Sequence, residues 1–299
     1  MAVQLAAPHT WPASVLPVLV ACALTLAHTG QLAVLDAILL LVICVLMQSS
    51  VNTFNDYYDY VKGSDSANDN VETSDAVLVY NNVNPREALI LAIGFLATAF
   101  ALGLVIIVHA GFMPLFIALV GALFVVAYSA GKTPISYLPI GELVSGVVMG
   151  GLIPLACYQV LTGWLNPWVF AWTVPEIIGI GLIMFTNNQC DIEKDQLAGR
   201  RTMPVCLGRA KARKLYSAVL ITWLVCIVVI VFLFFPRGAI VLPFLFAAAY
   251  PLLKALYANP LEPRTRIGAM AQVCSVNVVL GSFYALCIVT SGYALTFSL

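Results

Sequence analysis

The chain has 299 residues, of which 62% are hydrophobic and 9% are charged, and its 14 basic residues are matched by 14 acidic ones. Soluble domains are typically about 45–50% apolar and about 25% charged, so the composition excludes an ordinary soluble protein and indicates an integral membrane protein. Zero net charge identifies no partner by itself. We expect the lipid bilayer as the surroundings and no nucleic acid as a partner.

Apolar runs of membrane-spanning length recur along the whole chain. Each has close to the 20 residues that cross a hydrocarbon core about 30 Å thick, whereas the strands of an outer-membrane barrel are about ten residues long. The first run lacks the basic start and the cleavage site of a signal peptide, so we expect it to be retained. We predict an all-α integral membrane protein, a nine-transmembrane-helix bundle forming one domain over residues 1–299. The spans are about 12–29, 33–54, 87–109, 112–130, 139–161, 168–188, 214–235, 238–257 and 268–295.

Basic residues are distributed unequally between the two faces of this bundle. Every Lys and Arg except Arg237 falls in a loop on the same side as the N-terminus. Because positive residues stay in the cytoplasm, the N-terminus is predicted to lie inside and the C-terminus outside, in the cell membrane. The longest loops on the cytoplasmic face, about 55–86 and 189–213, are the predicted active-site loops.

Two pairs of acidic residues lie on that same face. Asp56 and Asp59 are three positions apart at the end of the second span, and Asp191 and Asp195 are four positions apart after the sixth. Residues at these spacings share one face of a helix. Two carboxylate pairs at one depth resemble the halves of a Mg²⁺ site that substrate phosphates complete. Each pair alone could equally be a solvated loop, and a transporter also carries acids, although nearer the bilayer midplane.

Arginines follow the second acidic pair closely. Arg200 and Arg201 come five and six residues after Asp195. A guanidinium matches the geometry of a phosphate, so the two arginines are candidates for binding a diphosphate. They could also be there only to fix the topology. Glu142, at the start of the fifth span, also has two interpretations, because it could contact a substrate or cap its helix.

At these residues the sequence resembles the UbiA-type superfamily of intramembrane prenyltransferases. The stretch N-D-Y-Y-D-Y-V-K-G-S-D at 55–65 is similar to the first aspartate-rich motif of that family. The stretch N-N-Q-C-D-I-E-K-D-Q-L-A-G-R-R-T at 187–202 is similar to the second, in the form of the branch that acts on 1,4-dihydroxy-2-naphthoate. Cys190 stands where that branch usually has Arg, which is expected to remove a cation beside the metal site.

The resemblance implies a reaction and a role for each residue. A polyprenyl chain would pass from polyprenyl diphosphate to 1,4-dihydroxy-2-naphthoate, with loss of CO₂, to give demethylmenaquinol; 4-hydroxybenzoate and homogentisate are the alternative acceptors. The implied Mg²⁺ ligands are Asp56, Asp59, Asp65, Asp191 and Asp195, with Asn55 as a further catalytic residue. The implied diphosphate-binding residues are Lys62, Lys132, Arg200 and Arg201. The residues implied to contact the acceptor or to stabilise an allylic cation are Tyr57, Tyr58, Tyr128, Tyr137 and Asn188.

Overall fold

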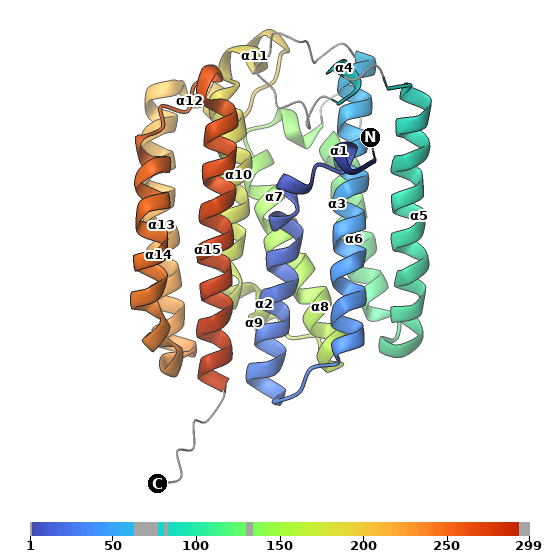
Figure 1. The fold of residues 1–299 in the computed structure, drawn as a ribbon, viewed down its shortest axis with the longest axis vertical. Coiled ribbons are helices and arrows are strands. Elements are labelled where there is room, and N and C mark those ends of the chain that lie inside the picture. Colours follow the sequence, from blue (N-terminus) through green and yellow to red (C-terminus); the bar gives the residue numbers. More distant parts are fainter. Residues whose placement is uncertain (1, 63–76, 81–82, 130–133, 293–299) are drawn as a thin grey trace.

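Long helices run side by side through the molecule (Figure 1). The computed structural model describes residues 2–62, 77–80, 83–129 and 134–292, and within these ranges the chain forms helices and no strand. The predicted all-α architecture is therefore confirmed. The long helices are α2 (Pro12–Thr29), α3 (Val34–Lys62), α5 (Pro85–Ala110), α6 (Met113–Ser129), α10 (Val174–Cys190), α13 (Arg209–Phe234), α14 (Leu242–Ala258) and α15 (Arg266–Gly292).

Most of the predicted spans are long and apolar enough to cross a membrane. Seven helical segments of the described chain meet both conditions: Pro12–Thr29, Val34–Tyr58, Pro85–Ala110, Gly141–Thr162, Arg209–Phe234, Pro236–Ala258 and Pro263–Gly292. The other two predicted spans correspond to α6 and α10, which have 17 residues each. The count of nine spans accordingly remains a prediction.

Shorter helices complete the two ends of the bundle. α4 (Val77–Tyr80), α11 (Ile192–Leu197) and α12 (Met203–Leu207) lie at the end drawn uppermost in Figure 1, whereas α9 (Trp168–Trp172) lies toward the other. The remaining short elements are α1 (Ala2–Leu5), η1 (Pro8–Thr10), η2 (Ile135–Tyr137), η4 (Pro236–Val241) and η5 (Pro263–Thr265).

The two predicted active-site loops are partly helical. α3 continues to Lys62, so Asn55, Asp56 and Asp59 lie on a helix and not in a loop. The helix extends because its polar end has partners: the Thr53 hydroxyl contacts the carbonyl of Leu5 at 3.1 Å, and Asp56 is 5% exposed. The second region, 189–213, holds α11, α12 and the first turn of α13.

The fifth span is not a single regular helix. It consists of α7 (Gly141–Val147), a π-helical segment η3 (Val148–Leu152) and α8 (Ile153–Thr162). Glycines let this span lie directly on the backbone of α10. A Cβ at Gly146 would stand 2.3 Å from the carbonyl oxygen of Ile177, and one at Gly150 would stand 2.5 Å from the nitrogen of Ile177. Small residues at helix contacts allow this approach in membranes, where dispersion forces and not the hydrophobic effect hold helices together.

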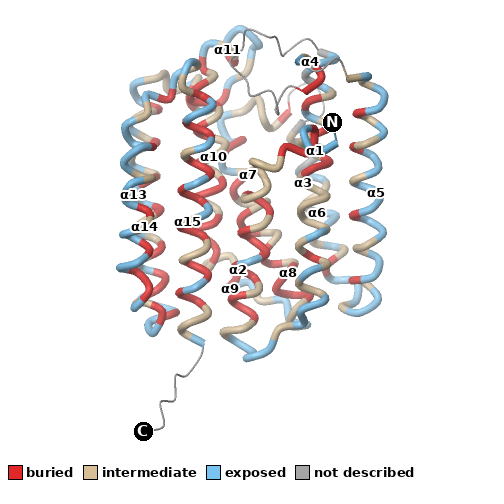
Figure 2. The backbone as a smooth tube through the Cα atoms, in the orientation of Figure 1, coloured by how far each residue is buried: buried red, intermediate tan, exposed pale blue. Residues whose placement is uncertain are grey.

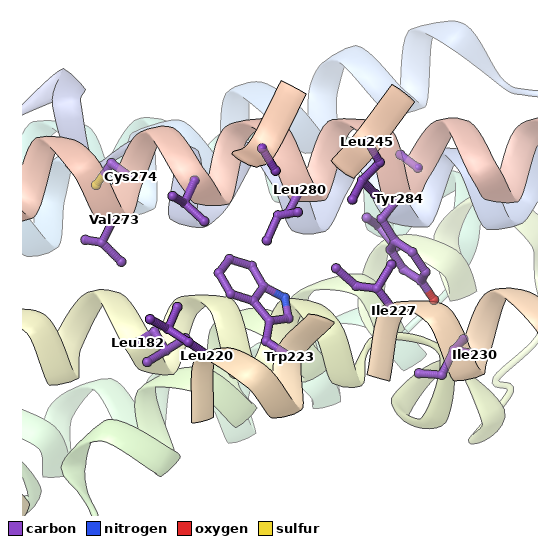
Figure 3. Close-up of a cluster of buried hydrophobic side chains, with 14 of the residues drawn as sticks. Leu182, Leu220, Trp223, Ile227, Ile230, Leu245, Val273, Cys274, Leu280 and Tyr284 are labelled. Atoms are coloured by element: carbon purple, nitrogen blue, oxygen red, sulfur yellow. The ribbon is translucent and has the colours of Figure 1, made fainter. Parts of the chain in front are cut away.

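Burial is concentrated on one side of the bundle. About half of α2 and of α15 is buried, against 17% of the apolar windows of α3 and α5 (Figure 2). The main core lies among α10, α13, α14 and α15, where the Trp223 ring lies close to Leu220, Leu280 and Ile227 (Figure 3). The result is a densely packed half, which contains α10, and a more open wall made of α3 and α5.

Candidate active site at one rim of the bundle

The second acidic pair lies where α10 ends and α11 begins. Asp191 is the residue between the two helices, and the Asp195 N–H donates to the Asp191 carbonyl at 2.8 Å. This single turn keeps the two carboxylates on the same side of the chain, as the spacing predicts. Asp195 is 2% exposed, so it is a buried acid at a helix end and not part of a solvated loop.

Both carboxyls are shifted toward their neutral forms. Burial raises the pKa of Asp191, although Arg266 and Lys194 oppose the shift, and burial raises the pKa of Asp195 to about 6, although Arg200 opposes it. The nearby cations of the protein therefore do not fully compensate these two charges. A divalent cation would supply the missing positive charge, and carboxylate oxygens are the ligands that Mg²⁺ prefers. The residues present at this half of the site thus fit the metal.

An arginine from the last long helix reaches this pair. Arg266, the first residue of α15, donates from Nε to Asp191 Oδ2 at 3.1 Å and from Nη2 to Asn187 Oδ1 at 2.5 Å. Cys190 supplies no cation at its own position, as expected, but Arg266 brings one to Asp191 from another helix. Cys190 itself is fully buried in the core. Sequence reasoning missed Arg266 because the contact joins residues 75 positions apart.

Arg200 lies beside the other carboxylate. Its Nη1 is 3.6 Å from Asp195 Oδ1, and its guanidinium lies over the ring of Tyr137, 5.0 Å from the centroid. The Thr202 hydroxyl donates to Asp195 Oδ2 at 3.2 Å. Arg201 contributes its backbone N–H to the Tyr137 carbonyl at 2.8 Å, and its side chain is exposed. The structure thus brings Arg200, Tyr137 and Asp195 together, while the Arg201 side chain points to solvent.

A second polar pair lies beside this cluster. Asn188 donates from Nδ2 to Glu142 Oε1 at 2.8 Å, and both side chains are buried. Glu142 Oε2 has no hydrogen-bond partner in the described part of the chain, and α7 has no side-chain cap. Glu142 makes no capping hydrogen bond, but it lies in the first turn of α7, where a carboxylate also suits the helix dipole, so both interpretations remain open. Tyr128 lies within electrostatic range of Glu142, Arg200 and Asp195, which joins this pair to the acidic cluster.

The first acidic motif lies at the end of α3. Asp56 Oδ2 accepts the N–H of Val77 at 3.0 Å, which fixes the start of α4. Tyr57 is partly buried and packs edge-on against Tyr58 with centroids 5.4 Å apart, whereas Tyr58 is 46% exposed. Asn55 is exposed on the same helix. One carboxylate oxygen of Asp56 thus has a structural role beside any role in binding.

Part of the predicted site lies outside the described residues. Asp65 and Lys132 belong to segments that the structure does not describe, and the side chains of Asp59 and Lys62 are likewise not described. Among the described residues, no group of three His, Cys, Asp or Glu side chains could hold a metal ion. The complete ligand set predicted from the sequence therefore remains a prediction.

The described chain is a bundle of membrane-length helices with buried carboxylates and arginines at one rim, which is the architecture of an integral membrane protein with a polar site at its edge. The model of the UbiA prenyltransferase family matches residues 14–271, more than half of the chain. The chain belongs to the UbiA prenyltransferase family.

Known proteins resemble the chain in sequence and in fold. It is 33% identical to 1,4-dihydroxy-2-naphthoate octaprenyltransferase of Bacillus subtilis, over 76% of this chain and 73% of that protein. It is 25% identical to UbiA prenyltransferase domain-containing protein 1 of Danio rerio, over 93% of this chain and 80% of that protein. Among solved structures, a UbiA homolog from Aeropyrum pernix K1 has a TM-score of 0.66 at 17% identity, covering 92% of this chain and 96% of its own. A UbiA homolog from Archaeoglobus fulgidus, bound to DMAPP and Mg²⁺, has a TM-score of 0.64 at 17% identity, covering 96% and 98%.

Proposed function

We propose that the protein transfers a polyprenyl chain from polyprenyl diphosphate to 1,4-dihydroxy-2-naphthoate, with loss of CO₂, to give demethylmenaquinol. The observation that carries this proposal is the 33% identity to the Bacillus subtilis octaprenyltransferase, over about three quarters of both chains. The solved relative bound to DMAPP and Mg²⁺ supports a prenyl diphosphate as donor and Mg²⁺ as cofactor.

The acidic residues would hold the cofactor. Asp191 and Asp195 lie one turn apart and are short of positive charge, and Asp56, Asp59 and Asp65 would complete the site from the first motif. When bound there, Mg²⁺ neutralises the diphosphate and makes it a better leaving group. Arg266 fixes Asp191 from α15, and outer partners of this kind orient metal ligands.

Basic residues and tyrosine rings of the protein would bind the polyprenyl diphosphate donor and stabilise its prenyl cation. Lys62, Lys132, Arg200 and Arg201 would bind the diphosphate oxygens, and Arg200 already lies at the rim beside Asp195. When the allylic C–O bond breaks, the prenyl carbon becomes positive, and the face of an aromatic ring stabilises such a cation. Tyr137 and Tyr128 are the rings that lie near Arg200, whereas Tyr58 is largely exposed.

The acceptor would react through an electron-rich ring carbon. Attack by the carbon that bears the carboxylate forms the new C–C bond, and release of CO₂ from that carbon restores the aromatic ring, so the step needs no strong base. The hydrogen-bonded pair of Asn188 and Glu142 would orient a hydroxyl of the acceptor, because Glu142 Oε2 is a buried acceptor atom without a partner in the described chain.

The proposal is tested with the purified full-length protein in detergent, Mg²⁺, a polyprenyl diphosphate and acceptor labelled at the carboxyl carbon. We expect a prenylated product without label, with the label recovered as CO₂, and no product from Asp191→Asn. Label retained in a prenylated product would refute decarboxylation. A clear preference for 4-hydroxybenzoate or homogentisate in the same assay would replace the proposed acceptor.

A further inference from the structure

A groove of about 470 Å³ lies on the outer side of the bundle between α13 and α14. Its lining residues are Arg213, Lys214, Ser217, Ala218, Ile221 and Tyr257. The two helices lie next to each other at one edge of the bundle (Figure 1). None of the lining residues belongs to the candidate active site.

The groove lies where α13 changes from charged to apolar. The first six residues of α13, Arg209 to Lys214, include four basic residues, and the twenty that follow to Phe234 include no charged residue. The boundary between lipid headgroups and hydrocarbon is therefore expected beside Lys214. Ala218 and Ile221, one and two turns further along, are exposed and face the acyl region.

The positive charge around the groove is not compensated. Arg209 forms an ion pair with Glu193, with nitrogen and oxygen 2.7 Å apart. In the part of the chain that the structure describes, Arg213, Lys214 and Lys254 have no acidic partner. Lys254 lies one turn before Tyr257 on α14, so it shares a face with the groove. Two cations without an acidic partner thus line the groove, and Lys254 lies one turn from its lining residue Tyr257.

The guanidinium of Arg213 is fixed in place but incompletely bonded. It lies over the rings of Tyr257 and Tyr216, at 5.6 and 5.9 Å from their centroids, and its Nη2 donates to the Tyr257 carbonyl. Its Nη1 is buried and has no hydrogen-bond partner among the described residues. A buried donor without an acceptor is costly and points to a ligand.

We propose that this groove binds the phosphate headgroup of an anionic phospholipid. The phosphate would accept from Arg213 and Lys214, and one acyl chain would run along Ala218 and Ile221. Basic pockets between transmembrane helices bind lipid headgroups by this combination of charge and apolar surface. A free phosphate would use the cations but not the apolar floor, so the exposed Ile221, at 61%, favours the lipid.

The test is native mass spectrometry of the full-length protein after reconstitution in mixed phosphatidylcholine and phosphatidylglycerol vesicles. We expect wild type to retain phosphatidylglycerol selectively. The double variant Arg213→Gln/Lys214→Gln should bind it roughly thirtyfold more weakly, because each basic residue near an anionic surface contributes about a fivefold factor. The matched control Arg86→Gln/Arg237→Gln removes the same charge at two exposed positions on other elements and should bind like wild type.

A second variant tests the shape of the site independently of its charge. Ala218→Trp leaves both cations in place and fills the groove, so it should also lose the bound lipid. Unchanged retention in Ala218→Trp, or in the double variant, would overturn the proposal. Displacement of the lipid by inorganic phosphate alone would identify a free anion as the ligand and would overturn the lipid assignment.

Discussion

At the scale of single residues, the contact that matters most is the one between Arg266 and Asp191. An acid and an arginine that are both largely buried stabilise each other only while both are present, because removal of one leaves an uncompensated charge. The side chains are 8% and 13% exposed, so water screens their charges little. Arg266 therefore holds Asp191 in position from a different helix, and it opposes without cancelling the effect of burial on the pKa of Asp191.

We predict that Arg266→Gln lowers activity by about 10–100-fold, the usual effect of losing a residue that orients a metal ligand. The loss should appear as weaker metal binding, measured by Mn²⁺ titration with electron paramagnetic resonance, as well as in rate. Arg266→Lys should recover part of both. Arg264→Gln, which removes an exposed arginine two positions earlier, is the control. Equal Mn²⁺ affinity in Arg266→Gln and wild type would contradict the assignment.

Asp195 predicts a pH dependence of metal binding. Its pKa is raised by burial from 3.8 to about 6, so without metal the folded protein holds a proton there that the unfolded chain releases near pH 4. This proton stabilises the fold at low pH, and its contribution is lost as the pH rises through about 6. Mg²⁺ needs the ionised form, so the increase in melting temperature that Mg²⁺ causes should grow up to about pH 6 and then level off.

The measurement is a series of thermal unfolding curves with and without Mg²⁺ between pH 5 and pH 8, run on wild type and on Asp195→Asn. The variant should show a smaller Mg²⁺ effect with no rise through about pH 6. An identical pH profile in the two proteins would exclude Asp195 as the titrating group.

At the scale of helices, the contact between α7–η3 and α10 depends on glycine. Gly150→Ala should lower the free energy of unfolding by about 1–3 kcal/mol or more, because the added methyl group would meet the backbone of Ile177 and not a movable side chain. Thermal unfolding in detergent measures the loss. Gly103→Ala in α5 is the matched control, since its Cβ would meet nothing within 4 Å. A variant at Gly150 as stable as the control would mean that the two spans are further apart than the structure shows.

Hydropathy alone located most of the helices, because a span must be apolar over a fixed length. α2 has the predicted bounds, and α5 and α14 differ from theirs by a few residues at the ends. The predicted span ended at residue 54, although the spacing of Asp56 and Asp59 indicated a helix there, and the full length of α3 depends on contacts with α1 and α4. In the candidate site, too, local arrangements were predictable from the sequence and contacts between distant residues were not. The turn from Asp191 to Asp195 follows from spacing, whereas Arg266 and the bond between Asn188 and Glu142 join residues distant in sequence.

At the scale of the whole molecule, the acidic rim and the loop after α13 lie at opposite ends of the bundle. The excess of basic residues at the rim predicts that it faces the cytoplasm. The protein offers a native probe there, because Cys206 in α12 is exposed. Arg237, in η4, is exposed at the other end.

We predict that a membrane-impermeant maleimide added to intact cells labels the variant Arg237→Cys in a Cys206→Ser background and does not label Cys206 in wild type. Permeabilised cells serve as the control, in which both positions should react. Labelling of Cys206 from outside would reverse the orientation, and labelling of both in intact cells would refute the helix count.

The contact face of α5 is a narrow stripe of mostly small residues. Ala88, Ala92, Ala99 and Ile106 are its buried positions, and the Ser50 hydroxyl of α3 donates to the Ala92 carbonyl at 2.8 Å. The strongly exposed apolar positions Ile90, Phe100 and Val108 lie outside this stripe, and lipid would require only that such side chains be apolar. Amino-acid substitutions should therefore accumulate faster at these exposed positions of α5 than within the buried stripe. A protein engineer has the same freedom at these exposed positions, which can be exchanged for other hydrophobic residues as long as the buried stripe and the remaining protein contacts of α5 are kept.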